Sequence, residues 1–320
     1  MALIKLNNRS SEDTAIHGRR NLIINGAMQV AQRGQSFTAQ GYSLDRWYHQ
    51  LSGGTSTTTQ ETFALGSEVA GCSKYLKQAT STADNYTGLV YKVEDVKSLP
   101  EGKATFSFYA KGTNPAGGSY TVRLDRVSRV SPYGSDSGPL SSTVTLTSSW
   151  QRFVYTFDVP SFSGLGTIDN TSHLYISIHQ ADGDTSTAAW ELNLTGVQLE
   201  VGSIATPFEQ RSYAEELSLC ERYYVKHSLD AYQRYDSAAH ADTTSRVWST
   251  PSLPTTMRTT PTISQTGLTV DGEAVVSIGS SGSGNQRLSF VFNHGSSRST
   301  GAQYQVYSIG SGTVTYSSEL

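Results

Sequence analysis

Short runs in which apolar and polar residues alternate are the strongest pattern in the chain. In "ATFSFYAKG", Phe106, Phe108 and Ala110 alternate with Thr105 and Ser107. The same period of two recurs in "SYTVRLDRV", "WQRFVYTFDVP" and "HLYISIHQ". Such alternation is typical of antiparallel strands with one buried and one solvated face. Segments rich in Gly, Pro and Ser separate the runs and favour turns, so the pattern predicts an antiparallel all-β fold.

The run "WELNLTGVQLEVG" changes phase in its middle. Leu192 and Leu194 fall on even numbers, whereas Val197 and Leu199 fall on odd numbers. One residue has therefore been inserted into the alternation, which predicts a β-bulge at Thr195–Gly196 that restores the inward face. Long bulged strands suit a sandwich of two sheets.

Two more segments predict strands outside this region. "YSLDRWYHQL" is rich in aromatic residues, and as one strand it would place Leu44 and Arg46 on one face and Trp47 on the other. Near the end of the sequence, "AQYQVYSIGSGTVTYSSEL" predicts two strands around its glycines, and "GEAVVSIGSSGSGNQRLSFVFNHGSS" predicts a hairpin.

One segment has a helical pattern. In "SYAEELSLCERYY", Ser212 and Glu215 fit a capping box, and Tyr213, Leu217 and Cys220 recur at helical spacing, as does Tyr224 further on. We expect a short helix that ends the first domain and packs on it; a subunit contact is the alternative. The expected parts are an arm over residues 1–20, a β-sandwich over 21–212, a linking helix over 213–225 and a smaller C-terminal β domain over 226–320.

Composition and charge exclude several classes of protein. Only 16% of the 320 residues are charged and the net charge is −3. Lys and Arg form no stripe, so nucleic-acid binding is not favoured. No apolar run approaches the ~18 residues of a membrane span, and "MALIKLNNRSS" lacks the apolar core of a signal peptide. Cys72 and Cys220 have no redox or zinc spacing, which favours two free, buried thiols.

The sequence gives little support to catalysis, a metal or a cofactor. In "ADGDT", Asp182 and Asp184 could offer carboxylates to calcium or to a sugar, but Asp-Gly in a loop favours a plain turn. His173, His179 and His240 have no nucleophile-elbow or metal spacing, and we expect them on solvated strand faces. "GSSGSG" lacks the lysine of a phosphate loop. We therefore expect no catalytic residue, no metal and no cofactor.

Aromatic residues are the better candidates for recognition, because sugars present C–H faces that can lie against aromatic rings. The candidates for such a platform are Tyr42, Trp47, Tyr48, Tyr86 and Tyr91. Large aromatic side chains also dominate sandwich cores, and we expect Trp47, Trp150 and Trp190 to be buried for that reason.

Five segments that occur in order carry a resemblance to a known family. They are "NLIINGAMQVAQRG", "SLDRW", "TFSFYAKG", "SSWQRFVYTFDVP" and "WELNLTGVQLEVGSIATPFEQR". Together they resemble a jelly-roll module of the carbohydrate-binding type found in virion proteins of tailed bacteriophages. The resemblance implies an antiparallel jelly-roll β-sandwich, followed by the short helix and the smaller β domain. It also implies that "NLIINGAM" forms a first strand paired with "VQLEVG", with a turn or bulge at Asn25–Gly26.

The resemblance implies a virion protein made in the bacterial cytoplasm without a signal peptide. The first hypothesis is a fibre or spike subunit that acts in attachment and not as an enzyme. Its arm would tether it to other virion proteins, and its β domains would meet a host surface glycan. The second is a capsid decoration or head-fibre protein. A polysaccharide depolymerase is less expected, because the chain has no repeat of 20 to 50 residues and no marked carboxylate pair. A homotrimer is expected, since partner chains would cover exposed strand edges.

Overall fold

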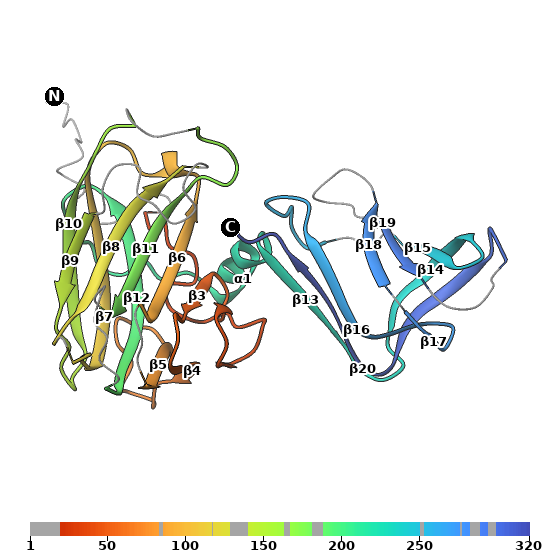
Figure 1. Cartoon of the computed structure of the whole chain (residues 1–320), viewed down its shortest axis with the longest axis horizontal. Coiled ribbons are helices and arrows are strands. Elements are labelled where there is room, and N and C mark those ends of the chain that lie inside the picture. The colour runs from red at the N-terminus through yellow and green to blue at the C-terminus, as the bar shows by residue number, and fades with distance from the viewer. Residues whose placement is uncertain are drawn as a thin grey trace, which may run out of the picture.

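The computed structural model describes residues 20–82, 86–116, 118–128, 140–162, 167–180, 188–249, 253–275, 277–281, 289–293 and 299–320. All but the last residue of the expected arm lies outside this described part. So do Asp182 and Asp184, together with the end of the "GSSGSG" segment. The remaining residues form two β units joined by a helix (Figure 1).

The first unit is an antiparallel jelly-roll β-sandwich, as the sequence predicted. In the described residues its first sheet has the order β1 (Ser36–Phe37), β4 (Thr55–Thr62), β5 (Lys74–Thr82), β12 (Trp190–Val201), β7 (Gly102–Thr113) and β10 (Gln151–Val159). The second sheet has the order β2 (Gly41–Tyr42), β3 (Trp47–Gln50), β6 (Gly88–Glu94), β11 (His173–Gln180), β8 (Tyr120–Val127) and β9 (Leu140–Val144). From β5 to β12 the chain crosses repeatedly between the two sheets, and a short 3₁₀ turn, η1 (Val96–Ser98), follows β6.

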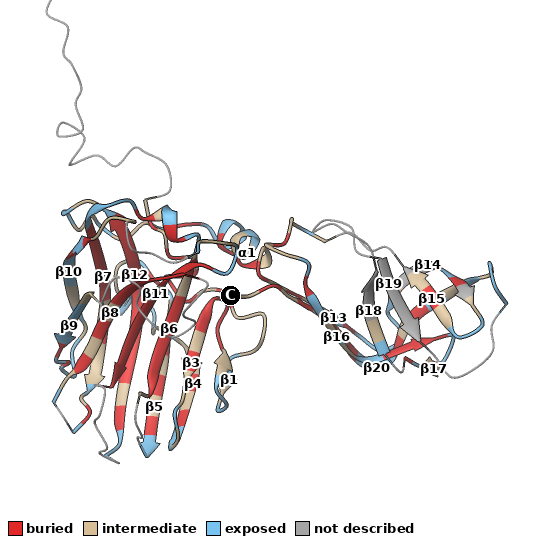
Figure 2. Ribbon diagram, turned by 45° about the horizontal axis from the view of Figure 1, so that its top comes forward, coloured by how far each residue is buried: buried red, intermediate tan, exposed pale blue. Residues whose placement is uncertain are grey.

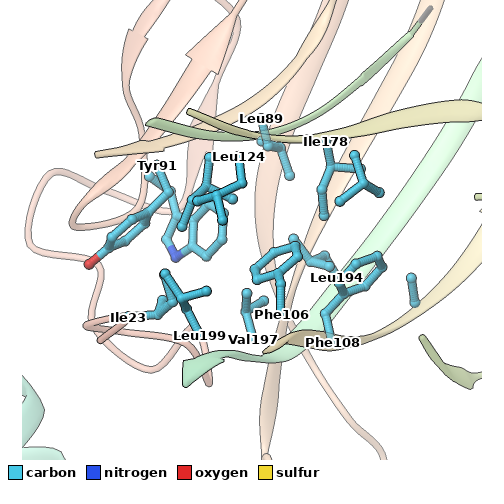
Figure 3. Packing of buried hydrophobic residues seen from close by; sticks show 14 of the residues in the cluster. Ile23, Leu89, Tyr91, Phe106, Phe108, Leu124, Ile178, Leu194, Val197 and Leu199 are labelled. Atoms are coloured by element: carbon cyan, nitrogen blue, oxygen red, sulfur yellow. The ribbon is translucent and has the colours of Figure 1, made fainter. Parts of the chain in front are cut away.

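The core of the sandwich lies between the inward faces of its two sheets. Figure 3 shows Phe106, Phe108 and Leu194 of the first sheet opposite Leu89 and Ile178 of the second. The alternation in the sequence therefore identified the buried face correctly. Each of these side chains is almost fully removed from water, and such burial is the main favourable contribution to folding.

The tryptophans divide between the core and the surface. Trp47 and Trp190 are each 2% exposed and belong to the core, as expected. Trp150 does not: it is half-buried, lies outside the core cluster, and immediately precedes β10. The expectation that Trp150 is a core residue was wrong, because it stands at the end of a turn and not within the alternating run.

The predicted β-bulge in β12 is confirmed. The register between β12 and β7 shifts between Thr195 and Gln198, and Gly196 has a φ of 57°. That left-handed conformation favours glycine. The shift allows Leu194 and Val197 to face the same core although their numbers differ in parity.

The start of the sandwich differs from the predicted first strand. Residues 24–27 form a turn, although the segment does follow β12: the Leu22 amide donates to the Leu199 carbonyl over 3.0 Å, and the Val197 amide donates to the Gly26 carbonyl over 3.0 Å. The positive φ of this turn belongs to Asn25, at 58°, and not to Gly26. Gly26 is required for another reason, because a Cβ there would lie 2.2 Å from the Val197 carbonyl oxygen.

The expected single strand from Tyr42 to Leu51 was also wrong. A turn interrupts it between β2 and β3, and Arg46 takes a φ of 72° within that turn. Leu44, Arg46 and Trp47 are consequently all buried, and the predicted separation of Arg46 from Trp47 on opposite faces does not occur.

The helix α1 (Tyr213–Glu221) lies between the two β units (Figure 1). The N-cap half of the predicted capping box is confirmed, because the Ser212 hydroxyl accepts a hydrogen bond from the Glu215 amide over 3.2 Å. It packs on the sandwich through Glu216 and Cys220, which are buried, whereas Tyr213 is 56% exposed. Cys72 and Cys220 are both free and buried, as predicted. Among the described helices, none has the length and apolar character that a membrane crossing requires.

The second unit is one antiparallel sheet with its own apolar core. In the described residues its order is β17 (Glu273–Ala274), β16 (Thr262–Val270), β20 (Gln303–Ser317), β14 (Arg234–Thr243), β15 (Arg246–Ser249), β19 (Ser289–Asn293) and β18 (Ser277–Ser281), and β13 (Tyr224–Leu229) also pairs with β20. The expected hairpin is present as β18 and β19. The two strands expected near the end are instead the single strand β20, whose register with β16 shifts between Ser308 and Thr313, where Gly310 and Gly312 lie.

Candidate ligand-binding site

A row of polar and aromatic residues crosses the outer surface of the second sheet. Strand register places Tyr48 opposite Val90, Val90 opposite Ser177, and Ser177 opposite Arg123. Successive residues of a strand point to opposite faces, and Leu89 faces the core, so this row faces away from the core. We name the surrounding surface the β11 face and define it by the residues Tyr48, Tyr86, Arg123, Asp125, Tyr175, Ser177 and His179.

Tyr86 joins the two ends of the β11 face. Its ring packs against the His179 ring with the centroids 4.2 Å apart and the planes tilted by 37°, and its hydroxyl is hydrogen-bonded to the Tyr175 hydroxyl over 2.7 Å. Tyr86 has a φ of 62°, a conformation that costs free energy for a residue with a large side chain. The surrounding contacts therefore hold Tyr86 in a defined position along β11.

His179 forms the base of this arrangement. Its Nδ1 is hydrogen-bonded to the Ser177 hydroxyl over 3.0 Å. Gly88 is paired with it on β6, and a Cβ on Gly88 would lie 2.5 Å from the His179 Cβ. The glycine thus makes room for the imidazole. The expectation of solvated histidines was wrong for His173 and His179, which are both buried, whereas His240 is exposed.

The charged groups of the β11 face lie on β8. Arg123 forms an ion pair with Asp125, and its guanidinium lies 5.9 Å from the centroid of the Tyr175 ring. Burial alone would lower the pKa of Arg123, but the Asp125 carboxylate outweighs that effect and raises it. Burial raises the pKa of Tyr175 well above its usual value, so its hydroxyl stays protonated at neutral pH. The face combines aromatic rings with fixed donors and acceptors.

The structure separates the tyrosines that the sequence suggested. Tyr48 and Tyr86 belong to the β11 face, and Tyr42 lies beside Tyr48, with the ring centroids 5.3 Å apart. The Tyr42 hydroxyl donates to the Leu320 carbonyl over 2.8 Å, so a segment of the chain itself already occupies it. Tyr91 is 1% exposed, faces the core, and its hydroxyl accepts from the Ile24 amide. Tyr91 and the buried Trp47 were therefore wrong candidates for a surface platform.

Sequence reasoning missed Arg123, Asp125 and Tyr175. The signal was present, because these residues occupy the polar positions of the alternating runs "SYTVRLDRV" and "HLYISIHQ". The polar positions of neighbouring strands lie side by side once the strand order is known. The strand order depends on contacts between distant segments, which alternation alone does not reveal.

Two cavities lie near α1, but their acidic groups are engaged within the protein. They have volumes of about 390 and 310 Å³ and share Glu94 and Asp95 in their linings. The Glu94 carboxylate accepts from Arg222 and from the Tyr223 hydroxyl, and that of Asp95 accepts from the Lys97 amide. These groups hold the helix and the loops of the sandwich, so the β11 face is the better candidate site.

The similarity to solved structures covers only part of the chain. No protein-family model matches the chain, and no curated protein matches it. Solved structures that align with it include a candidate sugar-binding protein from Bacteroides thetaiotaomicron, with a TM-score of 0.37 and 13% identity over 57% of this chain and 100% of that one. The enzymatically active domain of tailspike protein 4 from bacteriophage CBA120 has a TM-score of 0.37 and 11% identity, over 57% of this chain and 21% of that one.

A xylan-binding domain from Paenibacillus barcinonensis also aligns, with a TM-score of 0.33 and 15% identity over 52% of this chain and 99% of that one. The class of fold that the topology defines is an antiparallel jelly-roll β-sandwich. Similarities of this extent say nothing about what the chain binds, so its function has to be argued from its own residues.

Proposed function

We propose that the protein binds a glycan, without chemical conversion, on the β11 face of its sandwich. The observation that carries this proposal is the position of Tyr86, whose ring packs against the His179 ring and whose hydroxyl is hydrogen-bonded to the Tyr175 hydroxyl. A sugar ring needs an aromatic surface for its C–H groups and nearby polar groups for its hydroxyls. Tyr86 and Tyr175 supply the first, and Arg123, which the buried Asp125 holds in place, supplies the second.

Preorganisation supports binding at this face. The side chains are fixed by their contacts with one another, so a ligand that meets them has little side-chain entropy to remove. A single face of this size binds weakly, and several copies acting together on a repetitive polysaccharide would raise the overall affinity. This is the physical reason to propose a homotrimer.

In its biological setting we propose a fibre or spike subunit of a tailed bacteriophage. The protein would be made in the bacterial cytoplasm, anchored to other virion proteins by residues 1–20, and displayed toward the host surface. The ordered motifs that resemble phage jelly-roll proteins, from "NLIINGAMQVAQRG" onward, support this setting. Immunogold electron microscopy of phage particles tests it, and labelling confined to the capsid would overturn the fibre assignment.

The binding proposal is tested with Arg123→Gln and Tyr175→Phe, measured against an array of purified bacterial surface polysaccharides. Loss of a hydrogen bond to a charged group weakens binding by about tenfold or more, which is the effect expected for Arg123→Gln. Asp158→Asn is the control, because Asp158 is exposed on the other sheet. Unchanged affinity in both variants, or no glycan bound by the wild type, would overturn the proposal. Release of reducing ends would show that the protein is a depolymerase.

A further inference from the structure

Three half-exposed aromatic side chains lie together on the outer surface of the first sheet. Phe63 follows β4, Tyr75 belongs to β5, and Trp150 precedes β10. The centroid of the Trp150 ring lies 5.3 Å from that of Phe63 and 5.4 Å from that of Tyr75. None of the three belongs to the core. We name this cluster the aromatic patch.

The rings of the aromatic patch lie across the sheet. Strands β12 and β7 separate β5 from β10, yet the Tyr75 and Trp150 rings meet, so they extend over the strands between them. Asn193 and Thr195 of β12 lie in this region and are buried although their neighbour Leu194 faces the core. The rings of the aromatic patch therefore lie over buried side chains of β12.

The chain itself covers the adjoining part of this outer surface. Near the other end of β12, the Thr206 amide donates to the Glu200 carboxylate, and the Thr206 carbonyl accepts from Arg152. The Glu209 amide donates to the Gln198 side chain over 2.8 Å. The segment after β12 thus packs on one half of the outer surface, while Phe63, Tyr75 and Trp150 remain half-exposed on the other half.

Charged side chains are interleaved with the aromatic rings. The Lys111 ammonium lies 5.4 Å from the centroid of a Trp150 ring, and Lys111 makes no ion pair with any described residue. Lys77 is paired with Glu191 over 2.8 Å, and both are more than a third exposed at 35% and 38%. The centres of protein–protein interfaces are depleted in Lys and Glu. This mixture therefore favours a hydrated, polar ligand with an apolar face over a partner protein.

We propose that the aromatic patch is a second carbohydrate site, which takes an acidic sugar. The C–H face of a pyranose ring lies against Trp150, and the carboxylate of that sugar pairs with the Lys111 ammonium. The Glu191 carboxylate accepts a hydrogen bond from the Asn193 amide over 2.8 Å, and its exposed part borders the site as an acceptor for hydroxyl groups. This extends the proposed glycan-binding function to a different sheet and to a defined class of sugar.

The test measures binding of polygalacturonate, with neutral galactan and polyphosphate as comparison ligands, by isothermal titration calorimetry. Trp150→Ala should weaken polygalacturonate binding by at least about fivefold, as loss of a central aromatic contact does. Lys111→Gln should weaken it by a similar factor and reduce its dependence on salt. Lys103→Gln is the matched control, because it removes an exposed lysine from the same strand, β7. Thermal unfolding checks that each variant is folded.

Each outcome bears on one of the two sites. Retained polygalacturonate binding in both Trp150→Ala and Lys111→Gln would overturn the second site, as would polyphosphate binding that Lys111→Gln weakens equally. A fall in oligomer mass of Trp150→Ala by light scattering would make the patch a subunit contact and would also overturn it. If Arg123→Gln alone abolishes glycan binding, the β11 face stands and the patch fails. If only the patch variants lose binding, the β11 face fails and the patch stands.

Discussion

At the scale of single residues, the position of a tyrosine within a strand decides whether it is core or surface. Tyr91 and Val90 are neighbours in β6, and Tyr91 faces the core whereas Val90 faces outward beside Tyr48. The sequence "LVYKVE" could not reveal this, because it carries apolar residues at both parities. Val90 is itself buried although it faces away from the core.

Buried histidine makes the sandwich sensitive to acid. Burial lowers the pKa of His173 from its ordinary value of 6.5 to about 4. The unfolded chain therefore binds a proton below about pH 6.5 that the folded protein does not bind until about pH 4. The contribution of His173 to the free energy of unfolding is fully present above about pH 6.5. It falls by about 3 kcal/mol as the pH drops through this window. Burial lowers the pKa of His49 as well, so that residue acts in the same direction.

Urea unfolding at pH 7 and pH 4.5 measures this loss. His173→Gln should lose less stability between the two pH values than the wild type, because its side chain does not titrate. His240→Gln is the control for replacing a histidine, since His240 is exposed. If the wild type and His173→Gln lost equal stability between the two pH values, the loss of stability in acid would not come from His173.

At the scale of secondary-structure elements, alternation predicted the strands and the inserted residue in β12, because both are local properties of the sequence. It failed where the backbone turns without Gly or Pro, as at Arg46, which takes a left-handed conformation. It failed in the opposite way in β20, where Gly310 and Gly312 suggest a turn, whereas the strand continues through a register shift against β16 between Ser308 and Thr313. The β11 face and the aromatic patch could not be predicted from alternation either. Their residues come together through the strand order, which depends on contacts between distant segments of the chain.

The capping box of α1 gives a prediction at this scale. Ser212→Ala removes the acceptor of the Glu215 amide, and loss of an N-cap side chain costs about 1 kcal/mol. Thermal unfolding should therefore show a lower midpoint for Ser212→Ala, whereas Ser212→Asp should keep the wild-type value because aspartate is also a good N-cap. A midpoint lowered equally in both variants would show that the hydroxyl has another role.

At the scale of the whole molecule, a buried charge network joins the two β units. The Glu319 carboxylate pairs with Arg33 over 3.0 Å and with Arg46, whose side chain is 1% exposed. The Arg46 guanidinium also lies 3.6 Å from the centroid of the Tyr223 ring, just after α1. Figure 2 shows the C-terminal end of the chain beside the sandwich, where the Leu320 carbonyl accepts from Lys92 over 3.0 Å. The segment after β20 thus returns to the sandwich.

This network should hold the two units in a fixed arrangement, which is what a rigid projecting subunit requires. Glu319→Gln keeps the shape of the side chain but leaves the buried Arg46 without its counter-charge, and breaking a buried pair in this way costs roughly 3 kcal/mol. Asp158→Asn is the matched control, because its pair with Lys103 is exposed, and such pairs contribute about 0–1 kcal/mol. Differential scanning calorimetry and trypsin cleavage between α1 and β13 measure the difference. Equal effects of the two substitutions would mean that the junction depends on packing and not on charge.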